Sequence, residues 1–183
     1  SKPLGPTGWF VAERRFWDLL ARKDWLRYFE PGDVRAIVAE HVWEHLTLEE
    51  GRRAASLCFE FLAPGGYVRL AVPDGLNPDP EYAASIRPGG SGAGAQDHKV
   101  LYTCDMLSGI LETTGFEVRP LEYFDQNGVL HRRSWSQRDG PILRSRLNDP
   151  RNRPEAMRYA SLILDAIKPG PEAPQHSPGE ALP

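Results

Sequence analysis

Two short apolar segments on either side of a capped helix are the feature that most limits the folds open to this chain. Residues 34–39 form an apolar run with the length of a buried strand in a parallel sheet. Thr47 and Glu50 have the spacing of a capping box, which predicts that a helix begins at Thr47. The Pro-Gly-Gly sequence at 64–66 predicts the end of this helix, and residues 67–72 form a second apolar strand.

The second half of the chain continues this alternation of strands and helices. Thr103 is expected to begin a helix that ends at Gly115, and residues 116–123 follow as a third strand. Residues 129–132 are expected to form a short hairpin partner, and residues 161–165 the last strand. This order predicts the α/β class, with a Rossmann-like sandwich around a mostly parallel sheet.

Length and composition limit the domain organisation. The 183 residues, 40% of them hydrophobic, suit one globular domain with a substantial core. We expect that domain to span residues 1–168, and the Pro- and Gly-rich residues 169–183 to form a disordered tail. The glycine-rich segment at 78–99 is either a functional lid or a flexible loop. Cys58 and Cys104 fall in predicted helices and are expected to be buried free thiols.

Charge and hydropathy argue against several classes of partner. The formal net charge of -3 does not suit a nucleic-acid surface built on positive charge, and the arginines within 132–146 are interpreted as a solvated loop. No run approaches the roughly 20 apolar residues of a membrane span. No apolar signal segment follows Ser1. We therefore expect a cytoplasmic protein with a small-molecule substrate and with neither a nucleic-acid nor a membrane partner.

Three motifs in the first half of the chain occur in an order that resembles one enzyme superfamily. Residues 42–46 read Val-Trp-Glu-His-Leu, residues 62–66 read Leu-Ala-Pro-Gly-Gly, and the next strand ends at residues 73–74, Pro-Asp. This order resembles the fourth strand, the following helix and the fifth strand of class I S-adenosylmethionine-dependent methyltransferases, with Ala63 in place of the usual lysine. Further stretches resemble a small group of predicted methyltransferases, at residues 79–82, 88–90, 97–99, 115–116, 121–125, 149–152 and 161–166. The resemblance covers about residues 8–169 and implies methyl transfer from S-adenosylmethionine to an unknown small-molecule acceptor.

The cofactor-binding glycine turn of that superfamily is the main departure. In the family this turn follows the first strand and lets the backbone approach the cofactor closely, and this sequence has no such strand and turn. Gly8 and Trp9 resemble the opening of the family's second strand, which places Glu13 at the ribose-binding position. A sheet that lacks the first strand has an open edge. The chain is then truncated, naturally degenerate, or covered at this edge by a partner, for example in a homo-oligomer.

The resemblance implies functional residues at the carboxyl ends of the strands, where open α/β sheets bind ligands. The residues it implies for the cofactor are Gly8, Glu13, Glu40, His41 and His45. His41 is the first candidate for a catalytic base, because an unperturbed imidazole titrates near pH 6.5. His98, carried by the glycine-rich segment, and Asp74 are the other catalytic candidates. Each of these side chains can instead cap a turn or make a structural hydrogen bond.

His41, Glu44 and His45 also have the H-x-x-E-H spacing of an inverted zinc-peptidase motif. We expect no metal site, because His41 directly follows a strand and no second glutamate-bearing helix is evident. The hypotheses are, in order, a methyltransferase, a non-catalytic methyltransferase-like interaction module, and a zinc hydrolase. Asp149 and Arg151 are interpreted as an ion pair that holds a loop, with contact to an anionic substrate as the alternative.

Overall fold

The computed structural model describes residues 9, 12, 16–153 and 159–170 of the chain. Gly8, Glu13 and residues 171–183 of the predicted tail lie outside the described residues, so the statements made about them stay predictions. Within the described part, no helix combines the length and the apolar character needed to cross a membrane.

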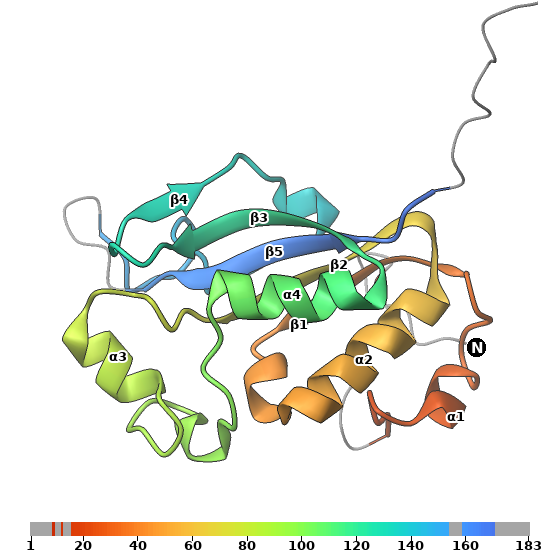
Figure 1. The fold of residues 1–183 in the computed structure, drawn as a ribbon, viewed down its shortest axis with the longest axis horizontal. Helices are drawn as coiled ribbons and strands as arrows, with labels where there is room; N and C mark the ends of the chain where they lie inside the picture. The colour runs from red at the N-terminus through yellow and green to blue at the C-terminus, as the bar shows by residue number, and fades with distance from the viewer. Residues whose placement is uncertain (1–8, 10–11, 13–15, 154–158, 171–183) are drawn as a thin grey trace, which may run out of the picture.

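The described fold is a five-stranded sheet with helices on one face (Figure 1). Its elements in chain order are α1 (Arg22–Trp25), β1 (Val34–Glu40), η1 (Trp43–His45), α2 (Leu48–Phe61), β2 (Leu62–Pro73), α3 (Pro80–Ile86), η2 (Ala95–Asp97), α4 (Cys104–Thr114), β3 (Glu117–Phe124), β4 (Leu130–Arg132), η3 (Gln137–Asp139) and β5 (Ser161–Ile167). The strands lie in the order β1-β2-β5-β3-β4. The predicted α/β class is therefore confirmed, and each strand expected from the sequence is present.

The sheet is mixed, so the expectation of a mostly parallel sheet is wrong. β1 and β2 pair in parallel, whereas β2 with β5, β5 with β3, and β3 with β4 pair antiparallel. It follows that β1, β2 and β3 point the same way, as strand–helix–strand connections require. The last strand, β5, lies between β2 and β3 in the opposite direction. Its insertion replaces what would be a parallel pair with two antiparallel pairs.

Local sequence signals mark the starts of the two longer helices and the end of α4 as expected, whereas α2 ends at Phe61 and residues 64–66, predicted to stop it, lie within β2. Thr47 and Glu50 make the reciprocal hydrogen bonds of a capping box at the start of α2. Thr103 accepts a hydrogen bond from the backbone N–H of Met106 at the start of α4. Gly115 ends α4 with φ 107°, a left-handed conformation that suits a residue without a Cβ. Both helices pack against the sheet whose strands β1 and β2 end at the candidate site.

Helices α2 and α4 cover one face of the sheet and form the main core with it (Figure 1). Phe61 of α2, Leu107 of α4 and Leu164 of β5 are all fully buried in this core. Cys58 and Cys104 are buried free thiols, as expected. Burial raises the pKa of Cys58 to about 12, which leaves this thiol protonated and unreactive at neutral pH.

Residues 133–153, between β4 and β5, pack on the other face of the sheet. The fully buried Ile142 belongs to a small core cluster on this face. Arg69 of β2 pairs with Asp165 of β5, with 2.7 Å between Nε and Oδ1. The same guanidinium donates hydrogen bonds to the carbonyls of Ser136 and Gly140, both at 2.9 Å. The buried Arg69 side chain thus holds residues 136–140 against the sheet. The chain then continues into residues 143–151, which line the candidate site.

Candidate functional site

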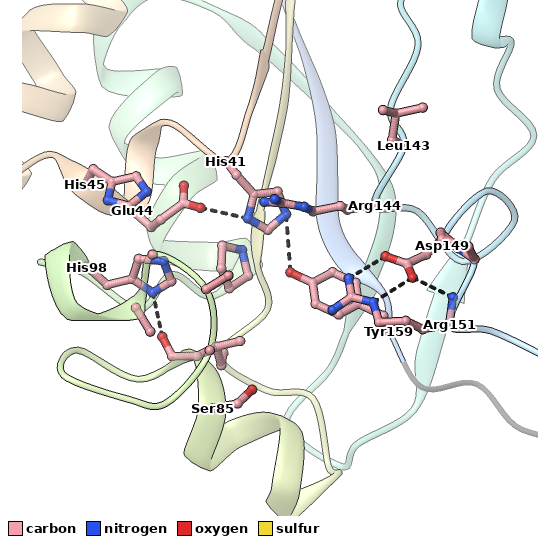
Figure 2. Close-up of a pocket in the computed structure, with 17 residues that line it drawn as sticks. His41, Glu44, His45, Ser85, His98, Leu143, Arg144, Asp149, Arg151 and Tyr159 are labelled. Carbon is pink, nitrogen blue, oxygen red and sulfur yellow. Dashed lines mark hydrogen bonds and ion pairs between the residues drawn. The ribbon is translucent and has the colours of Figure 1, made fainter.

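A cavity of about 740 Å³ lies at the carboxyl ends of the parallel strands β1 and β2 (Figure 2). It is lined by residues 41–45 after β1, by Pro73 at the end of β2, by Ser85 and Ile86 of α3, by residues 92–98, and by residues 143–151 together with Tyr159. Of Glu40, His41 and Asp74, which were expected at the carboxyl ends of the strands, only His41 lines this cavity. The cavity therefore collects residues from both halves of the chain.

The backbone at His41 turns sharply to bring its side chain into the cavity. Its φ of 54° is the only positive φ at a non-glycine residue in the described part of the chain. Such a conformation is uncommon for a residue with a Cβ and is typical of functional sites. The backbone N–H of His41 still donates to the carbonyl of Ala71 in β2, at 2.8 Å. The turn after β1 is therefore anchored to the neighbouring strand, and the short helix η1 then presents Glu44 and His45.

The His41 ring is held on both of its nitrogens. Nε2 lies 3.1 Å from the hydroxyl of Ser161 and 3.3 Å from that of Tyr159. Ser161 donates its own proton to the carbonyl of Arg144, at 2.6 Å, so its oxygen accepts from Nε2–H of His41. On the other side, Nδ1 lies 2.8 Å from Oε1 of Glu44. This arrangement determines the orientation of the ring in the cavity wall.

Glu44 is a buried carboxylate with an unusual lack of hydrogen bonds. The residue is 1% exposed, and neither carboxylate oxygen makes a hydrogen bond within the described part of the chain. The close approach of His41 Nδ1 has the distance of an ion pair but not the direction of a hydrogen bond. The backbone carbonyl of Glu44, in contrast, accepts from the N–H groups of Lys99 and Val100. The main chain is therefore well anchored, while the carboxylate faces two histidines without a donor.

Those two histidines come from different segments. The rings of His45 and His98 have their centroids 5.0 Å apart and are inclined at 73°. Nδ1 of His98 lies 2.6 Å from the carbonyl of Ile86, which can only accept, so Nδ1 carries the proton. Nε2 of His98 is then the unprotonated nitrogen. One ligand atom from each of Glu44, His45 and His98 lies within 4.8 Å of the others.

Glu40 and Asp74 satisfy backbone donors. The carboxylate of Glu40 accepts from the N–H groups of Leu143 and Arg144, at 3.1 and 2.6 Å, and so holds that part of the wall. Asp74 is buried and does not line the cavity; its two oxygens accept from Leu76 and Phe124. Burial raises the pKa of Asp74, although these two hydrogen bonds oppose the shift. The structure thus gives both carboxylates positions that organise turns around the strand ends.

Tyr159 is a residue of the site that we did not predict from the sequence. Its ring packs edge to face with Tyr82, with centroids 5.0 Å apart, and its hydroxyl approaches His41. Burial raises the pKa of Tyr159, so the hydroxyl keeps its proton at neutral pH. No motif in the sequence marks this tyrosine, because its role depends on where β5 enters the sheet.

Two arginines, Arg144 and Arg151, line the cavity and differ in their partners. Arg151 pairs with Asp149 through two hydrogen bonds, of 2.7 and 2.5 Å, which confirms the predicted ion pair. Its guanidinium also lies 3.8 Å from the centroid of the Tyr159 ring. Burial raises the pKa of Asp149, but the hydrogen bonds from Arg151 outweigh it, and the net shift is downward. Arg144 has no ion pair within the described residues, and its charge lowers the pKa of both Tyr159 and Asp149. Among the described residues, its guanidinium lies in the cavity wall without a salt bridge of its own.

Comparisons with known proteins found solved structures of similar fold. No protein-family model and no curated protein matches the chain. A SAM-dependent methyltransferase from Archaeoglobus fulgidus is 17% identical with a TM-score of 0.47, over 82% of this chain and 64% of that one. An O-methyltransferase family protein from Burkholderia thailandensis is 14% identical with a TM-score of 0.49, over 86% of this chain and 35% of that one.

A SAM-dependent methyltransferase from Methanosarcina mazei is 13% identical with a TM-score of 0.45, over 79% of this chain and 63% of that one. This chain therefore spans less than two thirds of the length of each of these three structures. The three alignments cover 79–86% of this chain at 13–17% sequence identity.

Proposed function

We propose that this chain acts in S-adenosylmethionine-dependent methyl transfer to a small acidic acceptor, which binds in the cavity at the carboxyl ends of β1 and β2. The observation that carries the proposal is that the methyltransferase-like motif, through His41, Glu44 and His45, forms the wall of this cavity. Ligands of open α/β sheets bind at this end of the strands. The volume of the cavity, about 740 Å³, lies within the range of roughly 300–1,000 Å³ that is usual for small-molecule sites.

Part of the proposed cofactor site lies in the wall of this cavity. Gly92 and Gly94 are part of its wall, and a Cβ at Gly92 would lie 2.8 Å from the backbone oxygen of Ser85, so this glycine lets residues 92–94 run close to α3. When bound, S-adenosylmethionine supplies a methyl group on a positively charged sulfur. The proposed cofactor contacts of His41 and His45 are in this wall, whereas those of Gly8 and Glu13 lie outside the described residues. Glu40 shapes the site through the backbone of residues 143–144.

The protein's contribution to methyl transfer is mainly alignment of the two reactants. Arg144 supports binding of an anionic group, because its guanidinium is not neutralised by an ion pair in the described part of the chain. Tyr159 offers a protonated hydroxyl beside it. His41 keeps this tyrosine and Ser161 in place through Nε2 and is therefore assigned as a positioning residue. Together these groups hold a polar acceptor in one orientation.

Calorimetric titration of the chain with S-adenosylhomocysteine tests the cofactor part of this proposal. We expect one site with micromolar affinity, because the product lacks only the transferred methyl group. An absence of binding at millimolar concentration would overturn the proposal.

The acceptor part is tested with S-adenosylmethionine labelled on its methyl group and a panel of small acids with matched neutral analogues. We expect labelling of acids only, and a loss of at least about tenfold in kcat/KM for Arg144→Gln, equivalent to about 1.4 kcal/mol. Arg138→Gln, an exposed arginine outside the cavity wall, is the matched control and should leave kcat/KM unchanged. Equal labelling of the neutral analogues would refute the acidic acceptor.

A non-catalytic interaction module remains the second candidate, and the position of β1 favours it. Among the described residues, β1 pairs with β2 and with no other strand, so its outer edge is open to a further strand. This candidate predicts that two copies associate through β1. Light scattering that shows a monomer at all accessible concentrations would exclude it.

A further inference from the structure

Glu44, His45 and His98 form a cluster that the methyl-transfer proposal does not explain. Their ligand atoms lie within 4.8 Å of one another. Glu44 and His45 are adjacent in the sequence, and His98 follows them by more than 50 positions. In Figure 2 the two histidines and the carboxylate lie next to one another on one side of the cavity. A nitrogen–nitrogen–oxygen set of this kind is found in transition-metal sites, including catalytic zinc sites with two histidines and one glutamate.

The carboxylate of Glu44 points independently to a cation. It is 1% exposed, and neither of its oxygens makes a hydrogen bond in the described part of the chain. Burial of a charged group is unfavourable unless the group is paired or coordinates a metal. His41 approaches Oε1 at 2.8 Å and leaves Oε2 without any close positive partner among the described residues. A metal ion between Glu44 and the two histidines would supply the missing interaction.

The hydrogen bonds around the cluster are those of a metal site. Nδ1 of His98 donates to the carbonyl of Ile86, which leaves the lone pair of Nε2 free for a ligand. Metal-binding histidines almost always donate their second N–H to such an acceptor, because this sets the tautomer and the orientation of the ring. Nδ1 of His41 lies 2.8 Å from Oε1 of Glu44, at ion-pair distance, and so faces the carboxylate only as a charge contact and not as a hydrogen bond. Both contacts organise ligands without occupying the place of the metal.

We propose that Glu44, His45 and His98 bind one divalent transition-metal ion, such as Zn²⁺, in the wall of the cavity. The histidines favour such an ion over Mg²⁺ or Ca²⁺, which prefer oxygen ligands. This assignment differs from the inverted zinc-peptidase pattern, in which His41 and His45 are the paired ligands and Glu44 is the base. In our assignment the two ring nitrogens of His41 face Glu44 and Ser161, so His41 is not a ligand. His45 and His98 are the two histidine ligands, and Glu44 is the third ligand.

Three protein ligands leave coordination positions open towards the cavity. An oxygen of the acceptor can occupy such a position, and the metal would then orient it and favour loss of its proton. This role of the metal rests on the proposed function, whereas the binding of the ion does not. Arg144, which also lines the cavity, would hold another part of the same acceptor.

The test uses the whole chain, first stripped with a chelator and then titrated with Zn²⁺, and separately with Co²⁺ while its visible absorption is recorded. We expect one ion per chain and a Co²⁺ spectrum typical of low coordination number. His98→Ala and Glu44→Gln should weaken binding at least 100-fold, and circular dichroism verifies that each variant is folded. His131→Ala is the matched control, because that exposed histidine pairs with Asp125 outside the cavity and should leave binding unchanged.

Sub-stoichiometric binding, or binding that survives His98→Ala, would overturn the metal site. Titration with S-adenosylhomocysteine before and after loading with Zn²⁺ separates this inference from the proposed function. Binding of one Zn²⁺ without any binding of S-adenosylhomocysteine would support the metal site and refute the methyl-transfer proposal. Binding of S-adenosylhomocysteine by a chain that takes up no metal would refute the metal site alone.

Discussion

Nε2 of His41 lies 3.1 Å from the hydroxyl oxygen of Ser161, which follows it by 120 positions in the sequence. This contact joins the carboxyl end of β1 to the beginning of β5, on the far side of β2. Because Ser161 also donates to the carbonyl of Arg144, one buried hydroxyl links the strand ends to the opposite wall of the cavity.

Replacement of Ser161 by alanine should therefore destabilise the fold. The carbonyl of Arg144 and the His41 ring would each lose a buried partner, and an unsatisfied buried polar group costs about 1–3 kcal/mol. Urea denaturation should show this loss in the free energy of unfolding. Ser56→Ala is the control, because that exposed hydroxyl bonds only within α2, and it should change the value by less than about 0.5 kcal/mol. Equal effects of the two substitutions would contradict the role given to Ser161.

Arg69→Met should be strongly destabilising. The Arg69 side chain is 4% exposed, pairs with Asp165 and donates to two carbonyls, so its loss leaves a carboxylate that is only 13% exposed without its partner. Removal of one partner of such a pair typically costs about 3–5 kcal/mol. Arg22→Met removes the exposed pair with Glu60 and should cost at most about 1 kcal/mol. Thermal unfolding of both variants measures the contrast, and a mild effect of Arg69→Met would argue against the buried pair as the anchor of residues 133–153.

Gly66→Ala and Gly109→Ala should have opposite effects on stability. A Cβ at Gly66 would lie 2.9 Å from the backbone oxygens of Ala63 and Arg35, which cannot move without shifting β1. At Gly109, in the middle of α4, a Cβ would meet nothing within 4 Å. Alanine is favoured over glycine by up to about 1 kcal/mol within a helix, so Gly109→Ala should raise the melting temperature and Gly66→Ala should lower it. A shift in the same direction for both would contradict the close approach at Gly66.

The ion pair between Asp149 and Arg151 should make stability depend on pH in the acid range. The pKa of Asp149 in the folded chain is below its ordinary value of 3.8, so the folded state binds this proton less strongly than the unfolded state. The stabilisation is therefore fully present above that ordinary value and is lost as the pH falls below it. Urea denaturation between about pH 7 and pH 3 should show the difference between the wild type and Asp149→Asn decreasing in acid. A constant difference over this range would exclude the predicted linkage.

Helix ends and apolar runs were predictable because their signals are local. Capping by Thr47 and Thr103 depends on hydrogen bonds within four residues, and both helices begin where these residues predict. Helix α3 was missed, although Asp79 caps it and Pro80 occupies its first turn, a combination that marks helix starts. The antiparallel direction of β5 was also not predicted, because it depends on the long segment between β4 and β5, which has no periodic pattern.

Some residues of the candidate site were also predictable from the sequence, and others were not. The resemblance named His41, His45 and His98 as candidate site residues, and all three line the cavity, whereas Glu40 and Asp74, expected at the strand ends, do not. No local pattern distinguished Tyr159 or Ser161. Likewise, the H-x-x-E-H spacing suggested His41 as a metal ligand, whereas its contacts with Glu44 and Ser161 assign it to positioning.

The sequence by itself determined the α/β class, the extents of the main helices and the strand ends that carry polar residues, since these follow from short-range periodicity and capping. Only the tertiary structure decided that β5 runs antiparallel in the sheet interior, that the Glu44 carboxylate is buried with no hydrogen-bond donor among the described residues, and that His98 comes to lie beside it. The reason is physical. Pairing between strands and the burial of a carboxylate depend on contacts between residues about 50 to 120 positions apart, which no local pattern encodes.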